Sequence, residues 1–79
     1  MENLVKYIVE NLVENKESIE LKSVDESEKV TVITVLVAKE DVGKVIGRDG
    51  KIASSIRTIV KSASAKLGKR FIIKIGERD

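Results

Sequence analysis

Two glycines that bracket two charged residues form the stretch of this sequence best suited to chemistry: Gly47, Arg48, Asp49 and Gly50. Glycine carries no Cβ, so such a turn lets the backbone of a ligand approach closely. Amide N–H groups beside a helix N-terminus suit an anion such as a phosphate. G-x-x-G alone is a weak signal, but here apolar residues precede it and a basic amphipathic run, residues 51–67, follows it. The stretch therefore predicts a site for a phosphate-bearing ligand.

Other glycine-loop functions do not fit. A Walker loop needs Ser or Thr after the Gly-Lys pair, whereas Ile52 follows Lys51, and the dinucleotide fingerprint G-x-G-x-x-G is absent. Tyr7 and Phe71 are the only aromatic residues, and both lie in apolar patterns, which argues against an aromatic platform for stacking bases. A nucleic acid would have to be held by backbone, charge and aliphatic contacts.

Composition limits the function further. The chain has 79 residues, which allows one small domain, and it contains neither Cys nor His. These absences exclude a disulfide framework and thiol chemistry, and they remove the commonest metal ligand and general base. We therefore predict no enzymatic activity, no cofactor and no small-molecule substrate. No apolar run approaches the ~20 residues of a membrane span, and the first residues do not resemble a signal peptide, so we expect a cytoplasmic protein.

The charges are distributed unevenly. The net charge is only +2, yet residues 1–29 hold eight acids and four bases, while residues 42–75 hold nine bases and one acid. This concentration of cations beside a glycine loop indicates a polyanionic partner. The alternative is an ordinary solvated helix face.

The first half of the chain predicts a helix and a hairpin. Apolar residues at helical spacing indicate a first helix that packs on the core and ends near residues 15–16. Alternation around Ile19 and Leu21 predicts a strand within residues 17–24, followed by a polar turn at 25–29. The β-branched residues 30–38 predict a second, antiparallel strand. This strand is apolar on both faces, so a sheet with helices on one side only would leave part of its second apolar set, which includes Val30, Val32 and Leu36, uncovered.

The second half predicts two helices and a strand. A short helix at residues 39–46 carries Glu40 and Asp41 in its first turn, where the helix dipole favours acids. A long helix follows the loop, and Gly68 marks its end. A last strand comes next, with three apolar side chains on one face. The apolar stripe of the long helix comprises Ile52, Ile56, Ile59, Val60, Ala63 and Leu67, and that of the strand Phe71, Ile73 and Ile75.

The order α-β-β-α-α-β, with G-x-x-G between two adjacent helices, resembles the bacterial (type II) KH fold over essentially the whole chain. Residues 41–60, DVGKVIGRDGKIASSIRTIV, carry the likeness most strongly, and the chain looks similar to bacterial single-KH-domain proteins of the KhpA family. The resemblance implies one α+β domain, residues 1–79, with three helices packed on one face of a three-stranded sheet. It also implies binding of single-stranded RNA, with the loop clamping about four nucleotides. Two residues depart from the common pattern: Ala53 replaces an aliphatic residue, and the carboxylate of Asp49 opposes phosphate.

The candidate RNA-binding residues follow from the loop and its flanks. The glycines supply clearance, and the cations at 48 and 51 supply charge-assisted hydrogen bonds. The cation at 44 would reach the same strand, and the arginine at 57 would contact backbone or a base edge. Ser54 is either a hydroxyl partner or a neutral surface residue, and Val45 and Ile46 either line a floor for bases or belong to the core, as we expect for at least one. The predicted set is Lys44, Ile46, Gly47, Arg48, Asp49, Gly50, Lys51, Ser54 and Arg57. The alternative is that both glycines serve only the turn.

Partners are implied by the same resemblance. It implies a homodimer, a heterodimer with a larger KhpB-like KH protein, or both, and a role as an RNA chaperone or post-transcriptional regulator linked to cell-envelope growth. Excess apolar surface supports association, either on the second strand or along the outer edge of the long helix's stripe. The competing hypothesis is a protein-interaction module with weak or lost RNA binding.

Overall fold

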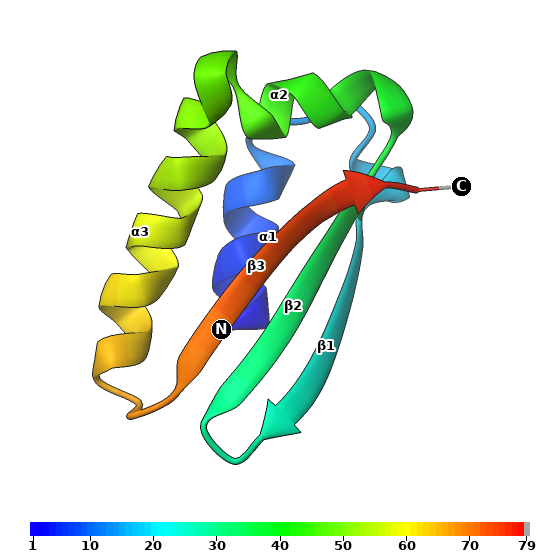
Figure 1. Ribbon diagram of the computed structural model, residues 1–79. Coiled ribbons are helices and arrows are strands. Elements are labelled where there is room, and N and C mark those ends of the chain that lie inside the picture. Colours follow the sequence, from blue (N-terminus) through cyan, green and yellow to red (C-terminus); the bar gives the residue numbers. More distant parts are fainter. Residues whose placement is uncertain (79) are drawn as a thin grey trace.

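The computed structural model describes residues 1–78 as three helices and three strands (Figure 1). Short 3-10 turns, Lys16–Ser18, Lys39–Asp41 and Arg48–Gly50, lie between the longer elements. In chain order the helices and strands are α1 (Glu2–Glu10), β1 (Glu20–Ser27), β2 (Val30–Val37), α2 (Val42–Ile46), α3 (Lys51–Ala65) and β3 (Arg70–Glu77). The predicted order α-β-β-α-α-β is therefore confirmed, and the class is α+β.

The sheet has the order β1-β2-β3, so β2 is central and both other strands are edges. β1 pairs antiparallel with β2, which confirms the predicted hairpin, and β2 pairs in parallel with β3. A parallel neighbour needs a long crossover, and the segment containing α2 and α3 provides it. β3 consequently ends up with one unpaired edge on the side of α3 (Figure 1).

One face of the sheet is covered by the helices (Figure 1). Ile33, Val35 and Val37 of β2 are completely buried on this face, and Ile73 of β3 lies beside Ile33 in the parallel register. The helices contribute Val5, Val9, Val45, Ile56 and Val60 to the same core. Burial of β-branched residues on one face of a pleated sheet is the main stabilising feature of this small domain.

Two predicted boundaries were wrong in the first half. The polar segment at 25–29 is not all turn, because β1 continues to Ser27 and only residues 28–29 form the connection. Asp25 is held in the strand because its carboxylate accepts a hydrogen bond from the Thr31 hydroxyl and forms an ion pair with Lys69 at 3.1 Å. Helix α1 ends at Glu10, not near 15–16, because the following residues turn to contact the start of α2, as described below.

The buried face of α3 also differs from the predicted stripe. Ala53, Ile56 and Val60 are buried together with Ser64, whereas Ile59 is 45% exposed and Leu67 61% exposed. The small side chains at 53 and 64 allow α3 to lie close to its neighbours, and the Ser64 hydroxyl is satisfied by the Lys61 carbonyl at 3.0 Å. The helix therefore shows a different set of residues to the core, although Gly68 stops it as predicted, with φ +63°.

The opposite face of the sheet carries no helix, as the resemblance to the KH fold implied, and the second apolar set of β2 lies on this face (Figure 1). Val24, Val32 and Ile72 lie side by side across the three strands in register. Val32 is buried between its neighbours, while Val24 is 60% exposed at the edge. We name the row Val24, Val30, Val32, Leu36 and Ile72 the open apolar face.

Candidate nucleic-acid interface

The GRDG loop connects α2 to α3 through a backbone that three of its four residues hold at positive φ. Gly47 has φ +77° and ψ 175°, Asp49 has φ +55°, and Gly50 has φ +72° in the left-handed helical region. The Gly47 N–H closes α2 on the Gly43 carbonyl at 2.8 Å, and the Gly50 N–H bonds the Gly47 carbonyl at 3.2 Å. Aspartate tolerates the left-handed region better than most residues, which gives Asp49 a conformational reason to be present.

The two glycines are required for different reasons. Gly47 occupies a backbone region that is essentially restricted to glycine, and a Cβ there would lie 2.6 Å from the Ile52 Cγ1 atom. Gly50 has no atom within 4 Å of the place where a Cβ would stand, so only its positive φ favours glycine. The side chain of Ile52, half-buried in the first turn of α3, thus supports the loop from beneath.

The side chains of the loop point to solvent. Arg48, Asp49 and Lys51 are exposed, and none of them forms an ion pair or side-chain hydrogen bond within residues 1–78. Ile46 is 37% exposed, whereas Val45 beside it is fully buried, which confirms that at least one of this pair belongs to the core. Ser54 is also exposed one turn into α3. The loop cations are therefore free to meet a ligand.

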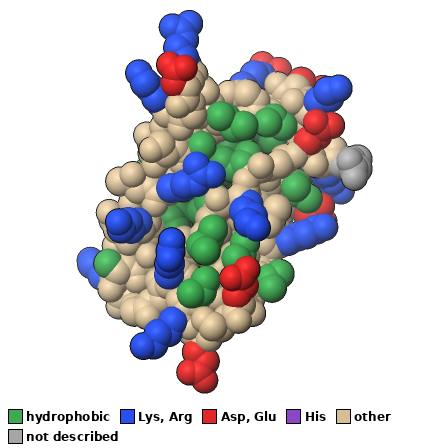
Figure 2. Space-filling view, viewed as in Figure 1, with side chains coloured by type: hydrophobic (Ala, Val, Ile, Leu, Met, Phe, Trp, Pro, Cys, Tyr) green, Lys and Arg blue, Asp and Glu red, His purple; other side chains and the backbone are tan. Residues whose placement is uncertain are grey.

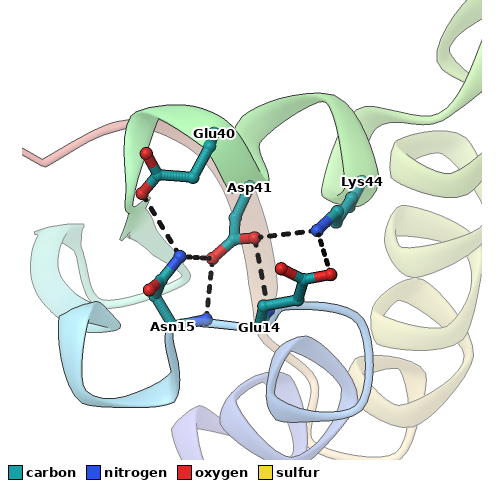
Figure 3. A network of polar contacts seen from close by, with 5 residues as sticks. All are labelled: Glu14, Asn15, Glu40, Asp41 and Lys44. Carbon is teal, nitrogen blue, oxygen red and sulfur yellow. Dashed lines mark hydrogen bonds and ion pairs between the residues drawn. The ribbon is translucent and has the colours of Figure 1, made fainter.

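A buried carboxylate anchors the helix that carries the loop. Asp41 is completely buried, and its oxygens accept hydrogen bonds from the backbone N–H groups of Glu14 at 3.2 Å and Asn15 at 2.9 Å (Figure 3). The Asn15 side-chain amide donates to the same carboxylate at 3.0 Å and to Glu40 at 3.2 Å. The sequence predicted only a dipole interaction for Asp41. The Glu14 and Asn15 donors lie more than 25 residues away from Asp41 in the sequence, and no local pattern identifies them.

Lys44 completes this network. Its ammonium lies 3.0 Å from Glu14 and 3.4 Å from Asp41 (Figure 3). The hydrogen bond that Lys44 donates to the Glu14 carboxylate is the largest of the causes that raise the pKa of Lys44. The structure thus places Lys44 in an ion-pair network with the α1–β1 connection, apart from the unpaired cations of the loop. Its contact with RNA stays a prediction.

The pKa of Asp41 reflects two opposing effects. Burial of the carboxyl would raise the pKa, but the donors on Asn15, Glu14 and Lys44 stabilise the anion more and bring the pKa to about 2, below its ordinary 3.8. A carboxylate held by several donors in this way is a fixed negative group at any physiological pH. It therefore keeps the α1–β1 connection joined to the start of α2.

A hollow of about 370 Å³ lies between α3 and the free edge of β3. Arg57 of α3 spans it, because one guanidinium nitrogen donates to the Ile73 carbonyl at 3.4 Å, which shows that this carbonyl points away from β2. Lys and Arg side chains gather on this face over α3 and β3, with apolar side chains between them (Figure 2). The hollow is lined by Arg57, Lys61, Ser64, Arg70, Phe71, Ile72 and Ile73. Its volume lies in the range of ligand-binding clefts, about 300–1,000 Å³.

The sequence predicted Arg57 for this site but missed the contribution of β3, as well as Lys61 and Arg70. The spacing of Arg57 and Lys61, four residues apart, was the available signal, because it places both cations on one side of α3. The edge position of β3 could not be read from the chain, since it depends on the parallel pairing with β2.

We compared the chain with families of known proteins. The family described as KhpA/KhpB, KH domain, matches residues 2–75. This chain belongs to the KhpA/KhpB family of KH domains. The family is a class of RNA-binding domains and not of enzymes.

Several curated KhpA/KhpB-family relatives cover nearly the whole chain. The RNA-binding protein KhpA of Caldanaerobacter subterraneus subsp. tengcongensis is 44% identical over 75 residues, 95% of this chain and 99% of the relative. That of Borreliella burgdorferi is 40% identical over 72 residues, 91% of this chain and 87% of the relative. That of Clostridium perfringens is 39% identical over 75 residues, 95% and 99% of the two chains. No solved structure matches significantly.

Two further observations concern the family pattern and the membrane. Ala53, the departure noted in the sequence, is buried where α3 packs, so a small residue suits this position. Among the residues that the structure describes, no helix has the length and apolar character needed to cross a membrane.

The loop geometry predicts unequal effects of alanine at its two glycines. Gly47→Ala should lower the free energy of unfolding by about 1–3 kcal/mol from backbone strain, with a further loss from displacing Ile52. Gly50→Ala should cost about 1–2 kcal/mol, the penalty of a left-handed alanine. Urea denaturation measures both. Gly43→Ala in α2 is the matched control and should be neutral or stabilising by about 0.5–1 kcal/mol. A Gly47→Ala variant as stable as this control would contradict the requirement for glycine at position 47.

The Asp41 network predicts acid sensitivity. Because the pKa of Asp41 falls from 3.8 to about 2 on folding, its stabilising contribution is complete above pH 4 and is lost as the pH falls toward 2. Asp41→Asn should therefore unfold at lower urea concentration than the parent at pH 7, and the difference should shrink below pH 4. Glu17→Gln, at an exposed acid, is the control and should behave as the parent. An unchanged Asp41→Asn midpoint at pH 7 would show that the network is dispensable.

Proposed function

We propose that this chain, as a single KH domain, binds single-stranded RNA by gripping its backbone at the GRDG loop and laying its bases along the α3–β3 hollow. The observation that carries this proposal is the set of cations without acidic partners around the loop and hollow. Of the nine bases in residues 42–75, only Lys44 and Lys69 form ion pairs within residues 1–78. The remaining seven leave a strong positive field for a polyanion.

The loop supplies the contacts to phosphate. Gly47 and Gly50 present no side chains, so a phosphate can reach the backbone N–H groups at the start of the 15-residue helix α3. Arg48 and Lys51 add charge-assisted hydrogen bonds from either side of the turn. Asp49 opposes the anion, and the cations on either side of it offset that charge.

The hollow supplies the contacts to bases. Phe71 is half-buried in its wall, and its ring offers apolar surface to a base. Arg57 and the outward-pointing Ile73 carbonyl offer one donor group and one acceptor for base edges. The names of the curated relatives, all RNA-binding proteins, favour RNA over other polyanions as the ligand.

The biological role that we propose is that of a cytoplasmic RNA chaperone or post-transcriptional regulator. One module that holds about four nucleotides binds weakly and with little sequence preference. Pairing of two modules would raise the affinity through effective concentration. We therefore propose that the chain acts as a homodimer, as a heterodimer with a larger KhpB-like KH protein, or as both.

The open apolar face favours this pairing. Val24, Val32 and Ile72 form a continuous apolar row on the side of the sheet away from the helices, and the hollow lies instead between α3 and the outer edge of β3. Contiguous exposed apolar surface marks interfaces in small proteins. A pure interaction module with lost RNA binding remains the competing function, and it would use this face without the loop.

Arg48→Asp tests the proposed grip. The variant places two adjacent carboxylates in the loop, and loss of the charge-assisted contact alone costs on the order of 1.5–3 kcal/mol. We expect RNA affinity to fall at least about tenfold, equivalent to ~1.4 kcal/mol. Stability should change by less than ~0.5 kcal/mol, because Arg48 is exposed and unpaired. Fluorescence anisotropy with single-stranded RNA measures the affinity, and thermal unfolding verifies the fold.

The control is Lys16→Asp, which makes the same change of charge at an exposed residue of the turn before β1. It should bind RNA within about twofold of the parent. The parent's log K should fall against log salt with a slope of about −2 to −3, for roughly three to four neutralised phosphates. If the folded Arg48→Asp variant binds as tightly as the parent, the loop is not the grip; if the parent shows no RNA binding at any salt, the interaction module is favoured.

Self-association is tested at the open apolar face. Val24→Lys places a charge at the exposed end of the apolar row and should convert the dimer to a monomer in sedimentation at tens of micromolar, with the thermal midpoint nearly unchanged. Ile59→Lys, at the exposed apolar residue of α3, is the comparison and should leave the dimer intact. A parent that sediments as a monomer would exclude homodimerisation, and loss of the dimer only in Ile59→Lys would move the interface to α3.

A further inference from the structure

A second, shallow hollow continues from the α3–β3 hollow beyond the end of α3. The two hollows share Lys61, Ser64 and Arg70 in their linings, so they are contiguous. The second one extends to Lys29 in the β1–β2 connection and to Lys69 before β3. Its lining residues place it at the end of α3, beside the turn between the first two strands. In Figure 1 this end of α3 is the one away from the GRDG loop.

Three cations without an acidic partner lie around this second hollow. Lys29, Lys61 and Arg70 line it, and none forms an ion pair within residues 1–78. Lys29 and Arg70 stand on adjoining strand ends, because the Arg70 N–H donates to the Lys29 carbonyl at 2.7 Å. Lys69 is different: the Asp25 carboxylate neutralises it at 3.1 Å. We name Lys29, Lys61 and Arg70 the distal cations.

The second hollow and the GRDG loop lie at opposite ends of α3. Helix α3 has 15 residues and is about 22 Å long at 1.5 Å per residue, with the loop at its start and this hollow at its end. A KH loop holds about four nucleotides. The C-terminus of α3 carries partial negative charge, so attraction of an anion here would come from the side chains and not from the helix.

We infer that the distal cations form a second binding surface for RNA backbone, which takes the phosphates of nucleotides that leave the α3–β3 hollow at the end away from the GRDG loop. The inference rests on the proposed RNA binding and extends its footprint beyond four nucleotides. The second hollow is open, and Val30, Ala65 and Gly68 form the rest of its wall. Such a surface suits a solvated sugar–phosphate chain and not an enclosed base, and its charge excludes a basic partner.

The test compares a tetranucleotide with octanucleotides extended separately at the 5′ and 3′ ends. Amide chemical shifts of the protein locate each contact. The tetranucleotide should move the amides of residues 47–52 and 73, and one of the octanucleotides should move those of Lys29, Gly68 and Arg70 as well. Three added phosphate contacts should steepen the salt slope by about 2, at roughly 0.7 per phosphate on a single strand. The same octanucleotide with uncharged methylphosphonate linkages in its extension should bind like the tetranucleotide.

Lys29→Glu tests the side chains. Lys29 lines only the second hollow, so the variant should bind the tetranucleotide as the parent does but should lose at least about threefold of the gain from the extension, with a salt slope shallower by about 0.7. Lys6→Glu, the same charge change on α1, should keep the whole gain. If extension moves no distal amide and adds no affinity in the parent, the second surface does not exist, although RNA binding at the loop stands. If neither the tetranucleotide nor the octanucleotides move the loop amides, the proposed function itself fails. If an acidic peptide binds at Lys29 and RNA does not, the occupant of the second hollow is a peptide and not RNA.

Discussion

The arrangement of the candidate site depends on the burial of one carboxylate. Asp41 lies at the start of the short helix α2. Its oxygens accept hydrogen bonds from the backbone N–H groups of Glu14 and Asn15, in the segment that follows α1. A five-residue helix has too few internal hydrogen bonds to be stable alone. Its position, and that of the loop at its end, is therefore determined by this tertiary contact together with burial of Val45. Within residues 1–78, no buried side-chain polar atom lacks a hydrogen-bond partner, so the network is fully satisfied.

The conformation of the loop is determined by contacts within the chain. The Gly47 backbone lies so near Ile52 that an added Cβ would stand 2.6 Å from the Ile52 Cγ1 atom, and Gly50 precedes α3 in a left-handed conformation. The missing Cβ atoms that the turn requires also leave room for a ligand to approach the backbone of the loop closely. A site held in one geometry before binding loses little entropy when a ligand arrives. The turn's structural needs and its proposed function are thus met by the same residues.

Folding preserves the separation of charge that the sequence shows. All four ion pairs of the described residues use acids from the first 41 positions, and they bind only Lys44, Lys69 and Arg78. The cations of the loop, of α3 and of the start of β3 stay uncompensated on one side of the molecule (Figure 2). Of the eight acids in residues 1–29, three form ion pairs, and these three are Glu14, Glu20 and Asp25.

The sequence by itself determined the order of the elements, the antiparallel hairpin, the glycine loop, the stop at Gly68 and the family, because hydrophobic period and turn chemistry depend on near neighbours along the chain. Only the tertiary structure decided the partners of Asp41 and Lys44, the buried face of α3 and the extent of the basic groove. These features join residues far apart in sequence: Ala53 and Ser64 are buried because α3 approaches its neighbours closely, and Arg70 faces Lys61 because β3 pairs in parallel with β2. Local patterns carry no information on such distances, which are set by how the helices and the sheet pack.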